Sequence, residues 1–260
     1  MKHRLFIVSG KGGTGKTSLS LALCKLLLDQ GFKVQYTAFD HEVEVEKLKE
    51  LEIPYFDTTV EKSCERYIGL KLKSETIAHW VMKTPFFSAL FSILPSLGSM
   101  ILLGHYIKEL ENDPELIIVL DSPATGHAKS MIEATNNFKE IFRAGVLVQD
   151  IHRMHQFLHN PENVKSLICS LPTEMSLQEA GELKRFMQSK GITNTSILLN
   201  NFIEKQDSNL DFLNRKISAE NEIINNFIQE EPISFKVPKF FKHSPIEVIV
   251  KMKERIEGIF

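Results

Sequence analysis

One octapeptide near the N-terminus limits the possible folds more than any other feature of the chain. Residues 10–17 read GKGGTGKT, which matches the pattern G-x-x-x-x-G-K-[ST]. The apolar run Leu5–Ser9 precedes it, and Thr17–Gln30, with leucines at helical spacing, follows it. Glycines let successive backbone N–H groups turn toward one anion, and the N-terminus of the following helix faces the same charge. The sequence therefore predicts a strand, a phosphate-binding loop and a helix in this order.

The predicted phosphate-binding residues are those of the loop and of the first turn of its helix: Gly10, Gly12, Gly13, Thr14, Gly15, Lys16, Thr17 and Ser18. We expect Lys16 to reach the β- and γ-phosphates of a nucleoside triphosphate, and the Thr17 hydroxyl to bind Mg²⁺. The pattern arises by chance roughly once in a hundred chains of this length. Here it also stands between the strand and the helix that it needs.

Further apolar runs of strand length alternate with helical stretches along the chain. The predicted strands are Lys33–Phe39, Glu115–Asp121, Lys165–Leu171, Thr195–Asn200 and Ile233–Val237. The run ELIIVLD at Glu115–Asp121 is continuously apolar, as is typical of a parallel strand buried on both faces. This alternation predicts an α/β fold with a doubly wound, mostly parallel sheet and right-handed crossovers.

Two stretches, residues 42–113 and 128–163, interrupt this alternation and have a mainly helical pattern. We expect a single domain over residues 1–260, with a small helical subdomain from about 60–110 and 128–163 that covers one edge of the sheet. A helix is also predicted between the strands at 165–171 and 195–200. Its pattern favours Ser176 as N-cap, Glu179 as the partner in a capping box and Gly191 as the stop.

Residues 85–104 contain no charged side chain and are long enough to cross a bilayer. Pro95 lies in the middle of this segment, which also contains Gly98 and four serines. Because proline breaks a helix, we interpret the segment as two buried helical pieces that meet at Pro95. The apolar run at the N-terminus ends at Val8, which favours a first strand over an export signal.

The composition argues against several other classes of function. The formal net charge is −2, so we expect no nucleic acid partner. The three cysteines, Cys24, Cys64 and Cys169, lie far apart and form no CxxC pair, so no zinc site of the usual spacing is predicted. Sparse cysteines fit a reducing cytoplasm, which is the expected location.

An acidic residue stands at the carboxyl end of two predicted strands. Asp121 ends ELIIVLD, and Asp40 follows KVQYTAF. The carboxyl ends of parallel strands border the crevice where ligands bind in such sheets. A carboxylate at this place can hold Mg²⁺ directly or through water, so Asp121 joins Thr17 as a predicted metal-binding residue.

Several segments resemble one family of nucleotide-binding proteins. Lys11 makes the loop KGGTGKT, which resembles the deviant Walker A loop of the MinD, ParA and ArsA group. The segment DSPATGH at Asp121–His127 resembles the switch II sequence of ArsA-type ATPases. Further similar segments are Leu171–Glu179, Leu198–Asn201 and Val237–Phe241 with Glu247. The chain is therefore similar to the ArsA-type ATPases, which include the arsenite-pump ATPase and the eukaryotic tail-anchored-protein targeting factor.

The resemblance implies a P-loop ATPase that hydrolyses ATP with Mg²⁺ as a nucleotide-switched homodimer. It implies that Lys11 reaches the nucleotide of the partner, that Asp40 orients the attacking water and that Gly126 lets switch II move. The implied catalytic residues are thus Asp40, Lys11 and Lys16. It also implies that Asn200 binds adenine, that Pro238 lines the base and that Phe240 or Phe241 stacks on it.

The resemblance leaves the client open, and the sequence departs from the family in switch I. Residues 40–43 read DHEV, where the family usually has DPAHS. One alternative is therefore a non-hydrolysing partner in a heterodimer with a related ATPase. A second is a carrier for hydrophobic protein segments. A third is a MinD- or ParA-like positioning ATPase that contacts a membrane only peripherally, through an amphipathic helix in Pro245–Phe260.

Overall fold

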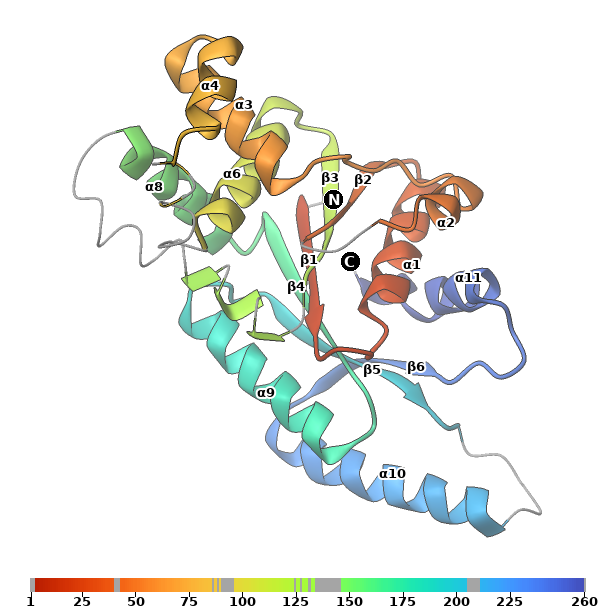
Figure 1. The fold of residues 1–260 in the computed structure, drawn as a ribbon. Coiled ribbons are helices and arrows are strands. Elements are labelled where there is room, and N and C mark those ends of the chain that lie inside the picture. The colour runs from red at the N-terminus through yellow and green to blue at the C-terminus, as the bar shows by residue number, and fades with distance from the viewer. Residues whose placement is uncertain are drawn as a thin grey trace.

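A computed structural model shows one layer of strands with helices on both of its faces (Figure 1). The structure describes residues 3–39, 43–85, 87, 89, 96–123, 125–126, 128–130, 132–133, 146–204 and 211–259. The strands are β1 Leu5–Gly10, β2 Lys33–Ala38, β3 Leu116–Asp121, β4 Val164–Ser170, β5 Thr195–Phe202 and β6 Ile233–Pro238. Each predicted strand is thus present, with ends that differ from the prediction by one or two residues.

The six strands form one sheet in the order β2-β3-β1-β4-β5-β6. Every neighbouring pair is parallel, so the predicted doubly wound α/β fold is confirmed. The chain leaves β1 toward β2 on one side, whereas β4 lies on the other side of β1. Ligands of open parallel sheets bind beyond the carboxyl ends of the strands near such a reversal. The loop after β1 lies at this place.

Burial of both faces explains why the strands are continuously apolar. Leu5 and Ile7 belong to the core on one face of the sheet, together with α6 and α9 residues. Phe6 and Val8 belong to the core on the other face, together with α1 and α11 residues. Successive side chains of a strand point to opposite faces of the sheet. Because helices cover both faces, side chains of both sets are buried, and the strand is apolar throughout instead of alternating with polar residues.

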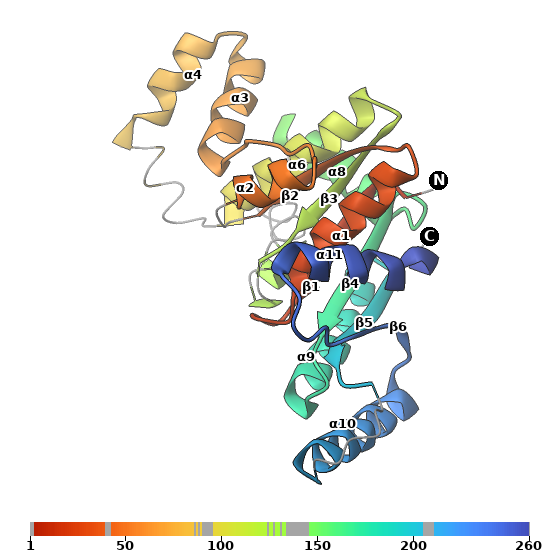
Figure 2. The ribbon, with the colours of Figure 1, turned by 90° about the vertical axis from the view of Figure 1, so that its right-hand side faces the viewer.

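The helices named in the described residues are α1 Lys16–Asp29, α2 Val45–Glu50, α3 Val60–Leu72, α4 Glu75–Met82, α6 Ser96–Asn112, α8 Val146–His159, α9 Glu174–Ser189, α10 Asp211–Glu230, α11 Pro245–Arg255 and the 3₁₀ helix η1 Glu257–Ile259. Helices α1 and α11 lie on one face of the sheet, and α6, α8 and α9 on the other (Figures 1 and 2). Helices α3 and α4 stand out beyond the sheet (Figure 2).

The C-terminal helix packs its apolar face against the body of the protein. Ile249, Met252, Ile256 and Ile259 are at most 2% exposed and share one core with α1. An ion pair of 2.6 Å between Lys253 Nζ and Asp29 Oδ2 joins α11 to the end of α1. Of the apolar residues that suggested a membrane-surface helix, these four are therefore covered, whereas Val250 is 37% exposed.

The uncharged segment at residues 85–104 ends inside α6. The side chains of Leu97, Met100, Leu102 and Leu103 are at most 5% exposed, so the second of the two predicted pieces is buried. Pro95 and the residues just before it lie outside the described part of the chain. Within the described ranges, no helix has the length and apolarity that crossing a bilayer would need.

Helix α6 attaches the helical layer to the sheet. Thr37 of β2 donates its hydroxyl hydrogen to the hydroxyl oxygen of Tyr106 on α6 at 2.6 Å, and both side chains are buried. Arg4, just before β1, donates from Nε to the carbonyl oxygen of Leu116 at 2.6 Å and from its terminal nitrogen to that of Leu110 at 2.9 Å. These bonds fix the turn that leads from α6 into β3. Whether the helical layer is a separate subdomain stays a prediction.

The predicted cap of α9 is wrong. The helix begins at Glu174, with Thr173 as N-cap residue, and Ser176 lies in its first turn. The Ser176 hydroxyl instead bonds to the hydroxyl of Ser170 and accepts a hydrogen bond from the backbone N–H of Leu171 at 3.0 Å. A local pattern cannot distinguish a cap from such a tertiary contact. The predicted stop is correct, because Gly191 has a left-handed φ of 86° directly after the helix.

Candidate nucleotide-binding site

The loop after β1 approaches two neighbouring strands so closely that glycine is required at two positions. A Cβ atom on Gly10, which has φ 141°, would lie 2.2 Å from the carbonyl oxygen of Cys169 in β4. A Cβ atom on Gly15, which has φ 95°, would lie 2.3 Å from Asn200 Nδ2 in β5. No side chain fits at either position, and left-handed backbone favours glycine in any case. The tight loop geometry that phosphate binding needs is therefore present.

Lys16 is the first residue of α1, and its side chain lies across the loop. Lys16 Nζ donates a hydrogen bond to the carbonyl oxygen of Lys11 at 3.0 Å. Burial lowers the pKa of Lys16, and the nearby carboxylate of Asp121 and thiol of Cys169 act in the opposite direction. The ammonium group is thus partly withdrawn from water and bound by a single backbone carbonyl, which a phosphate oxygen could replace.

Thr17 and Asp121, the two predicted metal-binding residues, are in direct contact. Thr17 Oγ1 donates to Asp121 Oδ2 at 2.7 Å, and the Tyr36 hydroxyl donates to the same oxygen at 2.9 Å. Asp121 is fully buried at the end of β3. Burial and the Asp121 carboxylate raise the pKa of Tyr36 far above its ordinary value, so Tyr36 stays a donor. Tyr36 is a site residue that the sequence pattern did not reveal.

This pair suits Mg²⁺, because the ion prefers oxygen ligands and keeps several waters and phosphate oxygens in its shell. One carboxylate and one hydroxyl therefore suffice from the protein. The described residues contain no cluster of three or more His, Cys, Asp or Glu side chains that could hold a metal ion by themselves. The arrangement thus fits a metal that comes with a nucleotide better than an independent metal centre.

Thr14 connects the loop to the neighbouring strands β4 and β5. Its hydroxyl donates to the carbonyl oxygen of Lys11 at 2.9 Å. Its own carbonyl oxygen accepts from Asn200 Nδ2 at 2.8 Å and from the Cys169 thiol at 3.1 Å. Gly12 and Gly13 are exposed at the tip of the loop, and Ser18 lies partly buried in the first turn of α1.

Asn200 holds the loop instead of facing an open surface. It is 2% exposed at the end of β5, and Thr14 uses its amide hydrogen. Its Oδ1 is buried and has no hydrogen-bond partner among the described residues. The role in binding adenine therefore stays a prediction. The next residue, Asn201, is exposed and has a left-handed φ of 58°, which asparagine tolerates well.

The two candidates for stacking on the base differ in exposure. Pro238 is buried where β6 pairs with Phe202 of β5. Phe240 is half-buried and packs against the core shared with α1, whereas Phe241 is 49% exposed. Phe241 is thus the more accessible ring of the pair, and Lys239 Nζ lies 5.3 Å from its centroid. Both assignments remain predictions.

Lys11 is bound within its own subunit. Its Nζ donates to Glu179 Oε1 at 2.6 Å and to Met175 Sδ at 2.9 Å, both on α9. The side chains of Lys11 and Glu179 are 38% and 35% exposed. The predicted capping box had given Glu179 another role, so sequence reasoning missed this contact. The contact between Lys11 and Glu179 depends on the packing of α9 beside the loop, which the sequence alone does not reveal.

The switch segments are described in part. Asp40 lies outside the described residues, so its predicted role in orienting water is a prediction only. Near the start of the segment similar to switch II, the Ser122 hydroxyl bonds to that of Ser9 in β1 at 2.9 Å. Gly126 is described, and a Cβ atom there would meet no atom within 4 Å. The segment is thus attached to β1 at its start.

The three cysteines are buried and free. Burial raises the pKa of the Cys64 and Cys169 thiols to about 12, and that of Cys24 well above its ordinary value. Soft metals and metalloids bind thiolates. Cys24 and Cys169 belong to the core on one face of the sheet and Cys64 to the other, so they do not form one thiolate cluster.

With this geometry established, comparison with known proteins decides the family. The profile of the CobQ/CobB/MinD/ParA nucleotide binding domain matches residues 5–239. The chain belongs to this family. The matched region contains β1 to β6, the loop after β1 and Asp121. Nucleotide binding at the loop is the function that the family name and the geometry share.

The similar proteins include arsenical pump-driving ATPases. The chain is 24% identical to that of Escherichia coli over 225 residues, which is 84% of this chain and 38% of the relative. It is 23% identical to putative arsenical pump-driving ATPase 1 of Aquifex aeolicus over an alignment 315 residues long, which covers 98% of this chain and 76% of the relative. The predicted ArsA-type assignment is thereby confirmed. The chain spans about two fifths of the length of the Escherichia coli relative.

We predict that Asn200→Ala destabilises the protein by about 1–3 kcal/mol, because the Thr14 carbonyl loses a buried donor. Urea unfolding followed by circular dichroism measures this change. Asn225→Ala is the matched control: Asn225 is exposed on α10, and its substitution should change stability by less than about 0.5 kcal/mol. Equal stabilities of the two variants would contradict the role of Asn200 in holding the loop.

Proposed function

We propose that this chain hydrolyses ATP with Mg²⁺ and that the nucleotide opens and closes a dimer of two chains. The observation that carries the proposal is the 2.7 Å contact between Thr17 Oγ1 and Asp121 Oδ2. It joins a hydroxyl from the phosphate loop to an acid from the neighbouring strand β3. The names of the similar proteins, which are ATPases, support the same reaction.

The residues of this chain divide the work of phosphoryl transfer. Mg²⁺, when bound, neutralises charge on the β- and γ-phosphate oxygens. Thr17 and Asp121 hold the ion, and the backbone N–H groups of residues 10–15 bind the phosphates. Lys16 exchanges the Lys11 carbonyl for a phosphate oxygen. Asp40 orients the attacking water. Catalysis of this kind consists mainly of positioning and electrostatic stabilisation.

The dimer requires Lys11 to change partners. In the single chain Lys11 is bound to Glu179 of the same subunit. An ion pair as exposed as this one contributes less than about 1 kcal/mol, so a phosphate of the partner's nucleotide can replace Glu179. We infer that Glu179 holds Lys11 in the free subunit and releases it when the dimer closes.

A carrier for hydrophobic protein segments is a second candidate, and one observation favours it. Four large apolar side chains are 47–70% exposed on the neighbouring helices α3 and α4: Leu70, Leu72, Ile77 and Trp80. Such a group of exposed residues marks interaction surfaces in many proteins. If a labelled apolar helical peptide bound native protein and Trp80→Ala equally well, this candidate would lose its support.

We predict that the native chain hydrolyses ATP only with Mg²⁺, and that Lys16→Ala and Asp40→Ala reduce the rate at least about a hundredfold. Both substitutions remove a group that acts in the transition state. A phosphate-release assay measures the rate, and light scattering measures the mass, which should double on addition of ATP. Lys49→Ala, at an exposed position of α2, is the matched control and should behave as the native chain.

If the native chain bound ATP but neither hydrolysed it nor changed mass, Asp40 would have no role in turnover. A non-hydrolysing subunit of a heterodimer would then be the better account, as the departure of residues 40–43 from the family's switch I sequence suggests.

We predict that Glu179→Gln lowers the ATP concentration at which half of the chains are dimeric by about twofold to fivefold, because Lys11 is no longer held within its own subunit. Light scattering during an ATP titration measures this. Glu182→Gln changes another carboxylate of α9. Among the described residues, Gln178 is its one hydrogen-bond donor. The control should leave the midpoint unchanged. A midpoint that Glu179→Gln leaves unchanged or raises would contradict the inferred release.

A further inference from the structure

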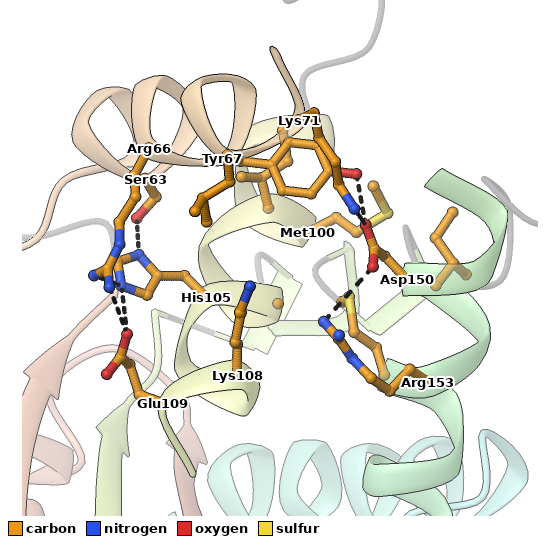
Figure 3. Close-up of a pocket in the computed structure, with 15 residues that line it drawn as sticks. Ser63, Arg66, Tyr67, Lys71, Met100, His105, Lys108, Glu109, Asp150 and Arg153 are labelled. Atoms are coloured by element: carbon orange, nitrogen blue, oxygen red, sulfur yellow. Dashed lines mark hydrogen bonds and ion pairs between the residues drawn. The ribbon is translucent and has the colours of Figure 1, made fainter. Parts of the chain in front are cut away.

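A second cavity lies in the helical layer, between α3, α6 and α8 (Figure 3). Its volume is about 220 Å³, and none of its lining residues belongs to the phosphate loop or to the residues around it. An engineered cavity of about 150 Å³ is known to admit benzene. The space therefore suits an aromatic ring with a short substituent, or a chain of similar size.

The floor of the cavity is apolar. Met100, Ile101 and Met154 line it and are at most 9% exposed. Gly104 of α6 has no side chain to fill the space, and a Cβ atom there would lie 2.9 Å from Met154 Sδ. Leu70 on α3 is 54% exposed at the same cavity, so an apolar group could enter from the side of α3.

One wall carries a cluster of charged and polar side chains that pair with one another. Arg66 forms an ion pair of 3.0 Å with Glu109 and donates to His105 Nε2 at 2.8 Å. A guanidinium group only donates, so Nε2 accepts, and His105 carries its hydrogen on Nδ1, 3.0 Å from the Ser63 hydroxyl. Burial, followed by Arg66, lowers the pKa of His105. His105 is therefore neutral at pH 7, and Glu109 is balanced by Arg66.

The opposite wall carries a second satisfied cluster. Asp150 on α8 accepts from the Tyr67 hydroxyl at 2.8 Å and forms an ion pair of 2.7 Å with Lys71. Burial acts to raise the pKa of Asp150, but the hydrogen bonds from Lys71 and Tyr67 outweigh it and hold the pKa below its ordinary value. Arg153 lies 3.7 Å from Asp150 and 3.3 Å from Glu111. The Asp150 carboxylate is thus already paired within the protein.

Lys108 is the remaining charge. It lines the cavity from α6, is half-buried, and within the described part of the chain has no hydrogen-bond or ion-pair partner. Its ammonium group lies between the two clusters, and no dashed line reaches it (Figure 3). The lining contains four cationic side chains, Arg66, Lys71, Lys108 and Arg153, and two anionic ones, Glu109 and Asp150. Arg66 and Lys71 pair with the two anionic residues and Arg153 pairs with Glu111, so Lys108 is the one lining cation without a partner among the described residues.

We propose that this cavity binds a small amphipathic carboxylate. The apolar body of the ligand packs against Met100, Ile101 and Met154, and its carboxylate pairs with Lys108. An apolar pocket with a few placed polar groups is the usual form of a small-molecule site. A cationic ligand would add to the excess positive charge, and a neutral one would leave Lys108 without a partner. The site is independent of the nucleotide site and does not rest on the proposed ATP hydrolysis.

Three probes with the same body and different head groups test the proposal: 4-phenylbutyrate, 4-phenylbutan-1-ol and 4-phenylbutylamine. Titration of the full chain, followed by nuclear magnetic resonance, measures each affinity. We expect saturable binding of one butyrate per chain, weaker binding of the alcohol and the weakest binding of the amine. Raising the salt concentration should weaken binding of the butyrate alone, because salt screens exposed charges.

Lys108→Gln should weaken binding of the butyrate about tenfold and change binding of the alcohol less than twofold, because only the charged contact is lost. Lys49→Gln is the matched control and should change neither affinity. Gly104→Leu fills the floor and should abolish binding of both compounds. A thermal melt of each variant verifies that it is folded, and Lys108→Gln removes no hydrogen bond or ion pair made among the described residues.

Three results would overturn the proposal. The first is the absence of saturable butyrate binding at millimolar concentration. The second is an equal affinity of native protein and Lys108→Gln for the butyrate. The third is tighter binding of the amine than of the butyrate, which would show that Glu109 and Asp150 attract the ligand instead of Lys108.

Discussion

The contact between the phosphate loop and the strands β4 and β5 determines much of the remaining site. Asn200 of β5 donates to the Thr14 carbonyl at 2.8 Å, and the backbone of β4 at Cys169 excludes any side chain at Gly10. The loop thus packs against two strands whose contact residues come 155 and 186 residues later in the chain. Glycine-rich loops of this kind bind phosphate through their backbone N–H groups, and the contact with the two strands holds the backbone in place. A loop of glycines without this support would have many conformations and would lose more entropy on binding.

The other side of the site depends on β2 and β3. Asp121 ends β3, and the hydroxyls of Tyr36 and Thr17 both point their hydrogens at one of its oxygens. These contacts join the first turn of α1 to two strands on the opposite side of β1 from β4. The strand order therefore determines the layout of the site, because the order β2-β3-β1-β4-β5 places Asp121 and Asn200 on either side of one loop. In a parallel sheet all of these strand ends meet at the same edge.

The fold was largely predictable from the sequence, and the site was predictable in part. Each predicted strand is continuously apolar over several residues, and burial on both faces leaves this pattern in the sequence. The loop, Lys16, Thr17 and Asp121 were recognisable because their roles depend on short spacing and on the end of a strand. The order of the strands leaves no such trace, so the contacts of Tyr36 with Asp121 and of Lys11 with Glu179 were not predictable. Ser176 shows the reverse error, because a hydroxyl that suits a cap serves a contact with Ser170 instead.

The charged residues of the helical layer and of the nucleotide site differ in how they are paired. Around the cavity between α3, α6 and α8, most charges are paired within the protein, whereas Lys108 has no partner among the residues that the structure describes. In the nucleotide site, Lys11 and Lys16 have partners that a phosphate oxygen can replace. Exchange of an existing partner costs less than burial of an unpaired charge, so a site of this kind can be stable both with and without its ligand.

The central claim is that the phosphate loop, together with Thr17 and Asp121, forms a site for a nucleotide with its metal ion. Calorimetric titration of the native chain and of Thr17→Ala with ADP, each in Mg²⁺ and in a chelator, tests this claim most directly. The account predicts one ADP per native chain, tighter binding with Mg²⁺ than without it, and loss of most of this Mg²⁺ effect in Thr17→Ala. Absence of ADP binding to the native chain, or an affinity that Mg²⁺ does not change, would contradict it.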